Sequence, residues 1–388
     1  MRKACVLSIR LYLQSYSQSL SAMGRMVVPL GKRRIAILLL FFPFFLSVQA
    51  LHWLGFLLDE IFFRGYRKVT VRNPLFITGV PRSGTTFLHR TFAKDEKQFT
   101  TFRTWEALLA PSVTEKKLLR GLSYIDKCIG RPLHRLFEAL TKKITGEFAD
   151  IHEVGPSAPE EDYLTLLPAG GCFILALAFP ANPAIWALAR FQDMPEEDRQ
   201  TLIAFYKSCM QKHLYTVAPG LRLLSKNAAF ASWIPDLRMA FPDSRFIFCI
   251  RDPKPTLSSQ LSSIISGIRF FATDSALDTF SLEFQTVLAH AYRVLRDEMQ
   301  SFLPDHLAII DLTYLKKDSE ALLTTVAKRL CLELDESLKQ AFREAGAESR
   351  AHVSQHKHVP VMAKSGPREF IACVQPLYEE MILNSVRL

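Results

Sequence analysis

The chain has 388 residues, of which 49% are hydrophobic and 22% charged, with 21 prolines and 16 glycines. This composition excludes a disordered chain, a collagen and a small disulfide-stapled protein. The length would allow two domains, but a single α/β domain with insertions also reaches this size.

The positive charge is concentrated at the N-terminus. The net charge is +10, yet residues 1–58 contain seven Lys or Arg and no Asp or Glu, while the rest of the chain carries 41 basic and 38 acidic residues. A nucleic-acid-binding domain would spread basic residues over its folded surface, so we expect no nucleic-acid partner. A basic arm beside an apolar run is typical of a chain that contacts a membrane surface.

An uncharged run of 24 residues, 35–58, follows the basic cluster at 32–34. The run is long enough to span a bilayer. It could equally form a helix that lies on the membrane or one that docks against the folded domain. A cleaved signal peptide is less favoured, because 34 residues precede the run. We therefore divide the chain into residues 1–58, a basic arm with an apolar membrane-proximal helix, and residues 59–388, a catalytic domain.

The cysteines and asparagines favour the cytoplasm for the catalytic domain. The seven cysteines are scattered without a C-x-x-C pair, and no asparagine lies in an N-x-S/T sequon. Scattered cysteines of odd number are typical of reduced thiols. The positive-inside rule, applied to the basic cluster at 32–34, would instead place the bulk of the chain outside. We expect a membrane-associated protein with a cytoplasmic catalytic domain.

Short apolar segments alternate with helical patterns from residue 75 onward. Strands are predicted at 75–80, 221–225, 245–250 and 307–310, and helices at 85–92, 195–216 and 319–332. This alternation predicts an α/β protein of three layers, in which helices cover both faces of a central, mainly parallel sheet. The expected fold is therefore P-loop-like, with the apolar helix preceding it.

Residues 79–86, GVPRSGTT, lie between the first predicted strand and the helix that follows. Converging backbone N–H groups and the positive end of the helix would favour a phosphate there. The spacing of the two glycines is that of a Walker A loop, but Thr85 stands where that loop has Lys. Arg82, at the tip, supplies the positive charge instead. The alternative is that the Gly and Ser residues only allow the chain to turn from the strand into the helix and that the turn binds no phosphate.

Residues 81–95, PRSGTTFLHRTFAKD, resemble the 5′-phosphosulfate loop of sulfotransferases that use 3′-phosphoadenosine 5′-phosphosulfate (PAPS). The closest resemblance is to the bacterial branch with Arg before Ser-Gly-Thr-Thr, and it runs from about residue 54 to 318. It implies PAPS as cofactor, 3′-phosphoadenosine 5′-phosphate (PAP) as product, and no metal. The residues that would hold the cofactor's 5′ end are Arg82, Ser83, Gly84, Thr85 and Thr86. Phe87 would lie near adenine, although a core Phe is an equal alternative.

Residues 245–259, RFIFCIRDPKPTLSS, resemble the 3′-phosphate element of the same family. Arg251 would offer its planar fork to the phosphate, and Ser259 a hydroxyl donor. Taken alone, Arg251 and Asp252 could be a local ion pair at the end of a strand. The phosphate loop upstream makes the pairing of the two elements specific.

Lys226 matches the lysine that the family carries after its third core strand, and it would neutralise the bridging oxygen together with Arg82. A surface lysine is the alternative. Cytosolic members have a histidine two residues later, where this chain has Ala228. The bacterial branch carries its histidine in a segment like the one that begins at His152. The resemblance therefore implies His152 as the general base, with Glu160 in reserve.

His352, His356 and His358 suggest a metal at first sight, but no Cys or carboxylate completes a ligand pattern, so we expect none. Glu161 and Asp162 are expected to cap the following helix or bind backbone.

Three functions remain open. The favoured one is a PAPS-dependent sulfotransferase that moves a sulfuryl group to a hydroxyl or amine. Its acceptor would be a small molecule or lipid, with a lipophilic one favoured because residues 164–179 and 261–271, the expected walls of the pocket, are apolar. The alternatives are a P-loop kinase or NTPase and a non-catalytic membrane-bound nucleotide-binding module.

Overall fold

The computed structural model of the chain describes residues 1–132, 135, 157–351 and 367–387. Five parallel strands form one sheet in the order β2-β3-β1-β4-β5. The strands are β1 (Leu75–Gly79), β2 (Phe99–Thr100), β3 (Arg222–Lys226), β4 (Arg245–Ile250) and β5 (Leu307–Asp311). The predicted α/β class and parallel sheet are confirmed, and the two-residue edge strand β2 is an addition to the prediction.

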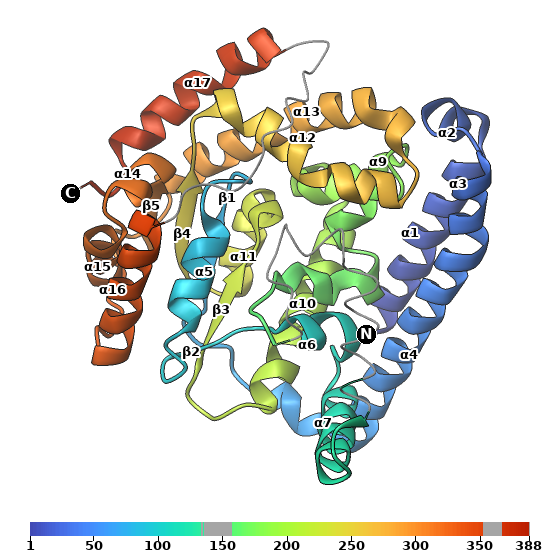
Figure 1. Cartoon of the computed structure of the whole chain (residues 1–388), viewed down its shortest axis with the longest axis horizontal. Coiled ribbons are helices and arrows are strands. Elements are labelled where there is room, and N and C mark those ends of the chain that lie inside the picture. Colours follow the sequence, from blue (N-terminus) through green and yellow to red (C-terminus); the bar gives the residue numbers. More distant parts are fainter. Residues whose placement is uncertain (133–134, 136–156, 352–366, 388) are drawn as a thin grey trace.

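Helices surround the sheet (Figure 1). The first part of the chain contributes α1 (Arg2–Leu20), α2 (Ala22–Val27), α3 (Lys32–Ala36), α4 (Phe42–Phe62), α5 (Thr85–Ala93), α6 (Thr104–Leu109) and α7 (Val113–Cys128). The middle of the chain contributes α9 (Pro183–Trp186), α10 (Glu196–Tyr215), α11 (Ile234–Ala240), α12 (Pro253–Phe270) and α13 (Leu277–Met299). The last part contributes α14 (Leu312–Lys317), α15 (Ser319–Arg329), α16 (Glu336–Ala351) and α17 (Pro367–Leu383).

Alternation along the strands produces two separate cores, because successive side chains of a strand point to opposite faces. Leu75 and Ile77 of β1 pack with buried residues of α5, α15 and α16, whereas Phe76 between them belongs to the other cluster. That second and larger cluster includes residues of α10, α11, α13 and the N-terminal helices. The sheet is therefore buried on both faces, as its unbroken apolar strands predict.

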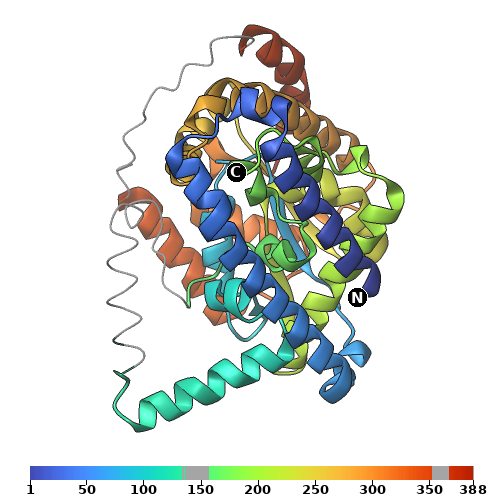
Figure 2. The same ribbon diagram turned by 90° about the vertical axis from the view of Figure 1, so that its right-hand side faces the viewer.

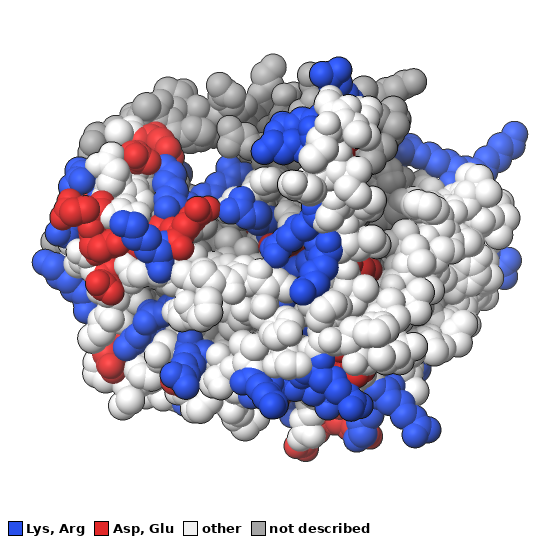
Figure 3. Space-filling view, turned by 90° about the horizontal axis from the view of Figure 1, so that it is seen from below, with Lys and Arg blue, Asp and Glu red and all other residues white. Residues whose placement is uncertain are grey.

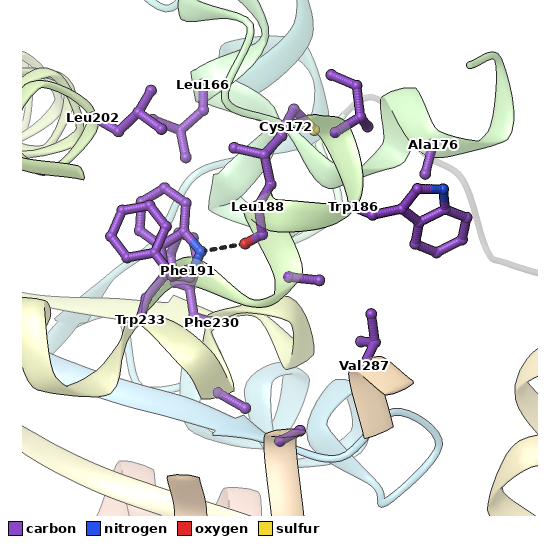
Figure 4. Close-up of a cluster of buried hydrophobic side chains, with 14 of the residues drawn as sticks. Leu166, Cys172, Ala176, Trp186, Leu188, Phe191, Leu202, Phe230, Trp233 and Val287 are labelled. Atoms are coloured by element: carbon purple, nitrogen blue, oxygen red, sulfur yellow. Dashed lines mark hydrogen bonds between the residues drawn. The ribbon is translucent and has the colours of Figure 1, made fainter. Parts of the chain in front are cut away.

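The larger core is dense in aromatic rings. Phe191 and Trp233 stack with their centroids 3.7 Å apart, and the Trp233 indole donates a hydrogen bond to the carbonyl oxygen of Leu188 at 2.7 Å (Figure 4). Residues 164–179 belong mostly to this core as short 3-10 turns. The expectation that this segment lines an open acceptor pocket is therefore wrong for most of its length.

The N-terminal helices dock onto the rest of the chain. The helical run Lys32–Phe62, which includes the π-helical turn Ile37–Phe41, contains the predicted apolar segment. Its length and composition suffice for a membrane span. Arg34 donates hydrogen bonds to the carbonyl oxygens of Ala178 at 2.7 Å and Phe271 at 3.1 Å, and the Trp53 indole donates one to Pro168 at 2.9 Å. These contacts fix the helices to the turns that form the core.

Candidate active site

The candidate residues gather at the carboxyl ends of three neighbouring strands. β1 lies between β3 and β4, although it precedes both in the sequence. After β1 the chain forms β2 and β3 on one side of it and then crosses over to form β4 and β5 on the other side. In open parallel sheets, ligands bind at this kind of switch point, outside the carboxyl ends of the strands. The phosphate loop follows β1, Lys226 ends β3, and Arg251 follows β4.

The phosphate loop is a tight turn between β1 and α5. Arg82 and Gly84 have left-handed backbone angles, with φ of 63° and 93°, and the Ser83 hydroxyl donates a hydrogen bond to the carbonyl oxygen of Val80 at 2.6 Å. Thr85 opens α5, whose first N–H groups have no acceptor within the helix. Gly79 lies so close to β4 that a Cβ would be 2.0 Å from the carbonyl oxygen of Cys249. The loop is thus pressed against the strand that carries Arg251.

Arg251 and Ser259 meet the phosphate loop at its tip. The Arg251 guanidinium donates a hydrogen bond to the carbonyl oxygen of Arg82 at 3.1 Å, and Arg82 Nε donates one to Ser259 Oγ at 3.4 Å. The Tyr292 hydroxyl holds the carbonyl oxygen of Arg251 at 2.6 Å. Two segments about 170 residues apart in sequence therefore form one cluster, as the sequence predicts.

The two guanidinium groups of this cluster lack acidic partners. Neither Arg82 nor Arg251 forms an ion pair with a carboxylate in the described part of the chain. Burial lowers the pKa of both, and the charge of Arg82 lowers the pKa of Arg251 further. Arg82 is exposed and Arg251 is half-buried. Two neighbouring cations that form no ion pair with a carboxylate of the described residues favour an anionic ligand.

Phe87 and Thr86 follow in the first turn of α5 and are half-buried. Phe87 packs against the core cluster of α5, α15 and α16. Phe87 therefore packs at the edge of this core cluster. Its contact with adenine stays a prediction.

Lys226 is buried at the end of β3, where its ammonium forms an ion pair with the carboxylate of Glu161. Pairing of β3 with β1 fixes its backbone, since the amide of Asn227 donates to the carbonyl oxygen of Ile77 at 3.0 Å. The surface-lysine alternative does not apply, because the side chain is enclosed. Burial and the nearby Lys226 charge lower the pKa of His89 on α5, which keeps that imidazole neutral.

The acidic segment after residue 156 runs beside the chain that leaves β2. The amide of Glu160 donates to the carbonyl oxygen of Phe102 at 3.0 Å, and the Glu160 carboxylate accepts a hydrogen bond from the amide of Glu161 at 2.9 Å. Glu161 makes no helix cap with its side chain and pairs with Lys226 instead, so the expected capping role is wrong for it. His152 lies outside the described residues, as do His352, His356 and His358.

A buried carboxyl group lies beneath this ion pair. Asp162 accepts a hydrogen bond from the Tyr206 hydroxyl, which lies 3.1 Å from Ser225 Oγ on β3. Burial raises the pKa of Asp162 to about 7, while the hydrogen bond from Tyr206 acts in the opposite direction. Sequence reasoning missed both this network and the Glu161–Lys226 pair, because the partners are far apart in the chain and no motif joins them.

Comparison with known proteins decides the family. The family model described as "Sulfotransferase family" matches residues 74–336, which is well over half of the chain and includes all five strands of the sheet. The chain belongs to the sulfotransferase family. A search of curated protein sequences finds no match.

Two solved mycobacterial sulfotransferases share the fold. Sulfotransferase STF1 from Mycobacterium tuberculosis H37Rv superposes with a TM-score of 0.68 at 13% identity, over 97% of this chain and 98% of STF1. Sulfotransferase STF9 from Mycobacterium avium gives 0.63 at 16% identity, over 85% of this chain and 81% of STF9. At such low identity the likeness supports the fold alone.

A cleft of about 790 Å³ lies along β2, and its lining includes neither the phosphate loop nor Lys226 nor Arg251. Its walls include Thr101, whose hydroxyl lies 2.7 Å from His89 Nε2, and Pro159, which precedes the acidic segment. Trp105 contributes an aromatic wall. Among the residues that the structure describes, no group of three or more His, Cys, Asp or Glu could hold a metal ion.

The raised pKa of Asp162 makes stability depend on pH. In the unfolded chain this carboxyl titrates near about 4, so between that pH and about 7 the folded state binds the extra proton. The free energy of unfolding therefore falls as pH rises through this window. In Asp162→Asn this decline should be absent, so that the variant gains stability relative to the wild type between pH 5 and pH 8 in urea titrations.

The matched control is Asp278→Asn, on the exposed side of α13. Its difference from the wild type should be the same at both pH values. Parallel pH curves for the wild type and Asp162→Asn would contradict the account.

Proposed function

We propose that this sulfotransferase moves a sulfuryl group from PAPS to a hydroxyl or amine acceptor and releases PAP. The observation that carries the proposal is the cluster of Arg82 and Arg251, two cations without a carboxylate partner at the carboxyl edge of the sheet. Such a cluster suits a nucleotide with an anionic group at each end. Phosphate and sulfonate oxygens would accept the hydrogen bonds that the guanidinium forks now lack.

The two halves of the cluster would bind different ends of the donor. The loop at 82–86 and the N-terminus of α5 would hold the 5′-phosphosulfate through backbone N–H groups and hydroxyls. Arg251 and Ser259 would hold the 3′-phosphate. Thr85 in place of the Walker lysine leaves the 5′ side with Arg82 as its cation, which favours this donor over ATP.

Lys226 would neutralise the oxygen that bridges phosphate and sulfur as the sulfuryl group leaves. Sulfuryl transfer resembles phosphoryl transfer, in which positioning and charge neutralisation supply most of the catalysis. In the structure Glu161 holds this ammonium close to the end of β3. The ion pair orients the Lys226 side chain in its buried position.

The acceptor must lose a proton, and three residues compete for that role. His152 remains the predicted base, since the described residues do not include it. Glu160 is half-buried and accepts a hydrogen bond from the amide of Glu161, and Glu161 contacts Lys226. A base must lie within hydrogen-bonding reach of the acceptor hydroxyl. Substitution of each of the three residues should therefore affect the rate of transfer differently.

A lipophilic alcohol or lipid remains the proposed acceptor class. Ile264 and Ile265 lie half-exposed on α12, one to two turns after Ser259. The cleft along β2 adds Trp105 and Phe99 beside polar walls. An acceptor with an apolar body and one polar head fits such mixed walls.

The direct test is transfer of labelled sulfate from PAPS to a lipid and metabolite extract, read by mass spectrometry. The wild type should label an extractable lipophilic product. Lys226→Ala should lower kcat by about 100-fold to 1000-fold with a smaller effect on PAP affinity, because the lost charge acts mainly in the transition state. Lys207→Ala, which removes an exposed lysine of α10, should leave both values unchanged. Turnover of Mg²⁺-ATP without transfer from PAPS would contradict the proposal.

The base is tested by pH profiles of kcat/KM for His152→Ala, Glu160→Gln and Glu161→Gln. Loss of the base should remove the rise in rate that accompanies its deprotonation and lower the plateau by about 100-fold or more. We expect this for His152→Ala alone. An unchanged profile in that variant, with the loss in Glu160→Gln or Glu161→Gln, would assign the role to that carboxylate.

A further inference from the structure

α4 has two different faces. One face is buried against the rest of the chain and carries polar groups that are satisfied there. His52 Nδ1 lies 2.6 Å from the carboxylate of Glu115, and Asp59 accepts hydrogen bonds from the amides of Val113 at 3.0 Å and Thr114 at 2.8 Å. Asp59 also forms a fully buried ion pair with Lys212 at 2.8 Å.

The opposite face of α4 and of the π-helical turn before it is exposed and apolar. Only 22% of the most apolar part of this run is buried. The exposed apolar side chains are Leu39, Leu40, Phe44, Leu46, Leu51, Leu54, Leu57, Ile61 and Phe62. No charged residue interrupts this face between Ile35 and Leu58. Exposed apolar surface of this extent marks a contact with a membrane or a partner.

α1 and α7 flank α4 and continue its exposed apolar surface. Tyr12 of α1 packs edge-on against Phe45, with the ring centroids 5.8 Å apart, and α1 exposes Val6, Ile9 and Leu13 at helical spacing. α7 exposes a stripe of one residue per turn, consisting of Leu118, Leu122, Ile125 and Ile129. Figure 2 shows α1 and α4 side by side in the foreground, with α7 below them. We call the exposed apolar residues of these three helices the apolar platform.

The basic residues beside the apolar platform fall into two groups. Lys3 and Arg10 of α1 form ion pairs with Glu197 and Asp198 of α10. α2 exposes Arg25, and α3 exposes Lys32 and Arg33; none of the three forms an ion pair with a carboxylate in the described residues. Residues 1–58 contain no acid at all. Seen from below, a broad uncharged surface occupies the right-hand side, and the charged side chains around it are mostly basic with some acidic ones among them (Figure 3). Basic residues beside an apolar face complement an anionic lipid surface.

We propose that the apolar platform binds an anionic lipid bilayer, with α1 and α4 lying in the plane of its interface. The catalytic domain would then rest on one side of the membrane. The proposal does not depend on the sulfotransferase reaction. It concerns a surface remote from Arg82 and Arg251.

A transmembrane orientation of α4 conflicts with its buried face. To cross the bilayer, the helix would have to leave its docking site, which would expose Asp59, Gln49 and His52 to hydrocarbon and leave Lys212 buried without its partner. Each such change is costly. An in-plane helix keeps all these contacts and still buries the apolar platform in lipid.

Binding is tested with the full chain and vesicles of phosphatidylcholine, with or without phosphatidylglycerol. The wild type should float with both and prefer the anionic vesicles. The triple variant Leu40→Glu, Leu51→Glu and Leu54→Glu should lower the partition coefficient by about tenfold or more, because three charges enter the interface. Arg25→Gln, Lys32→Gln and Arg33→Gln together should abolish the preference for phosphatidylglycerol only.

The matched control is Met239→Glu, Leu282→Glu and Leu303→Glu, three equally exposed apolar residues outside the apolar platform. This variant should bind like the wild type. Equal loss of binding in both Glu variants would overturn the proposal. A wild type that stays off vesicles and forms a dimer, which the Leu40, Leu51 and Leu54 substitutions dissociate, would assign the apolar platform to a second copy of the chain.

The depth of individual residues in the bilayer distinguishes a helix that lies in the plane of the interface from one that spans the membrane. Tryptophan is placed at Leu40, Leu51 or Ile61, and its added fluorescence is quenched by lipids brominated at different depths. An in-plane helix predicts the same shallow quenching at all three positions. Deep quenching at Leu51 with shallow quenching at Leu40 and Ile61 would show a span and overturn the proposal.

Discussion

The site depends on two guanidinium groups that the fold brings together without a counterion. β1 and β4 are adjacent, so the turn that carries Arg82 and the strand end that carries Arg251 meet at the same edge of the sheet. Burial lowers the pKa of both groups, and the charge of Arg82 lowers the pKa of Arg251 further, so the two cations repel each other. An anion at this point would remove the repulsion, which is why the packing of these two strands supports the proposed donor with two anionic groups.

The remaining parts of the site follow from the same sheet. β3, on the other side of β1, delivers Lys226 to the shared edge, and the segment beside β2 brings Glu161 to its ammonium. Gly79 lies so close to Cys249 that no side chain fits between them, and the phosphate loop starts directly beside β4. On the opposite side of the larger core, the N-terminal helices hold the turns at 164–179. One compact body thus carries the site and the apolar platform on separate surfaces.

Sequence patterns predicted the elements that are regular and local. The strands around Phe76 and Phe246 are apolar throughout because helices cover both faces of the sheet, and the loop from Gly79 to Thr86 has a distinctive order of residues. Pairings between distant side chains could not be read in this way. The contact of Glu161 with Lys226 and that of Tyr206 with Asp162 depend on how segments cross in three dimensions. The apolar segment 164–179 was misread, since apolar composition describes a core turn and a pocket wall equally well.

The most direct test compares the affinities of PAP and adenosine 5′-phosphate, which differ only by the 3′-phosphate, in the wild type and in Arg251→Ala by titration calorimetry. In the wild type the 3′-phosphate should strengthen binding by about tenfold to a hundredfold, the contribution of charge-assisted hydrogen bonds. In Arg251→Ala that advantage should largely disappear, while Arg269→Ala, an exposed arginine at the far end of α12, should retain it. An advantage that survives in Arg251→Ala, or equal affinity for the two nucleotides in the wild type, would contradict the account.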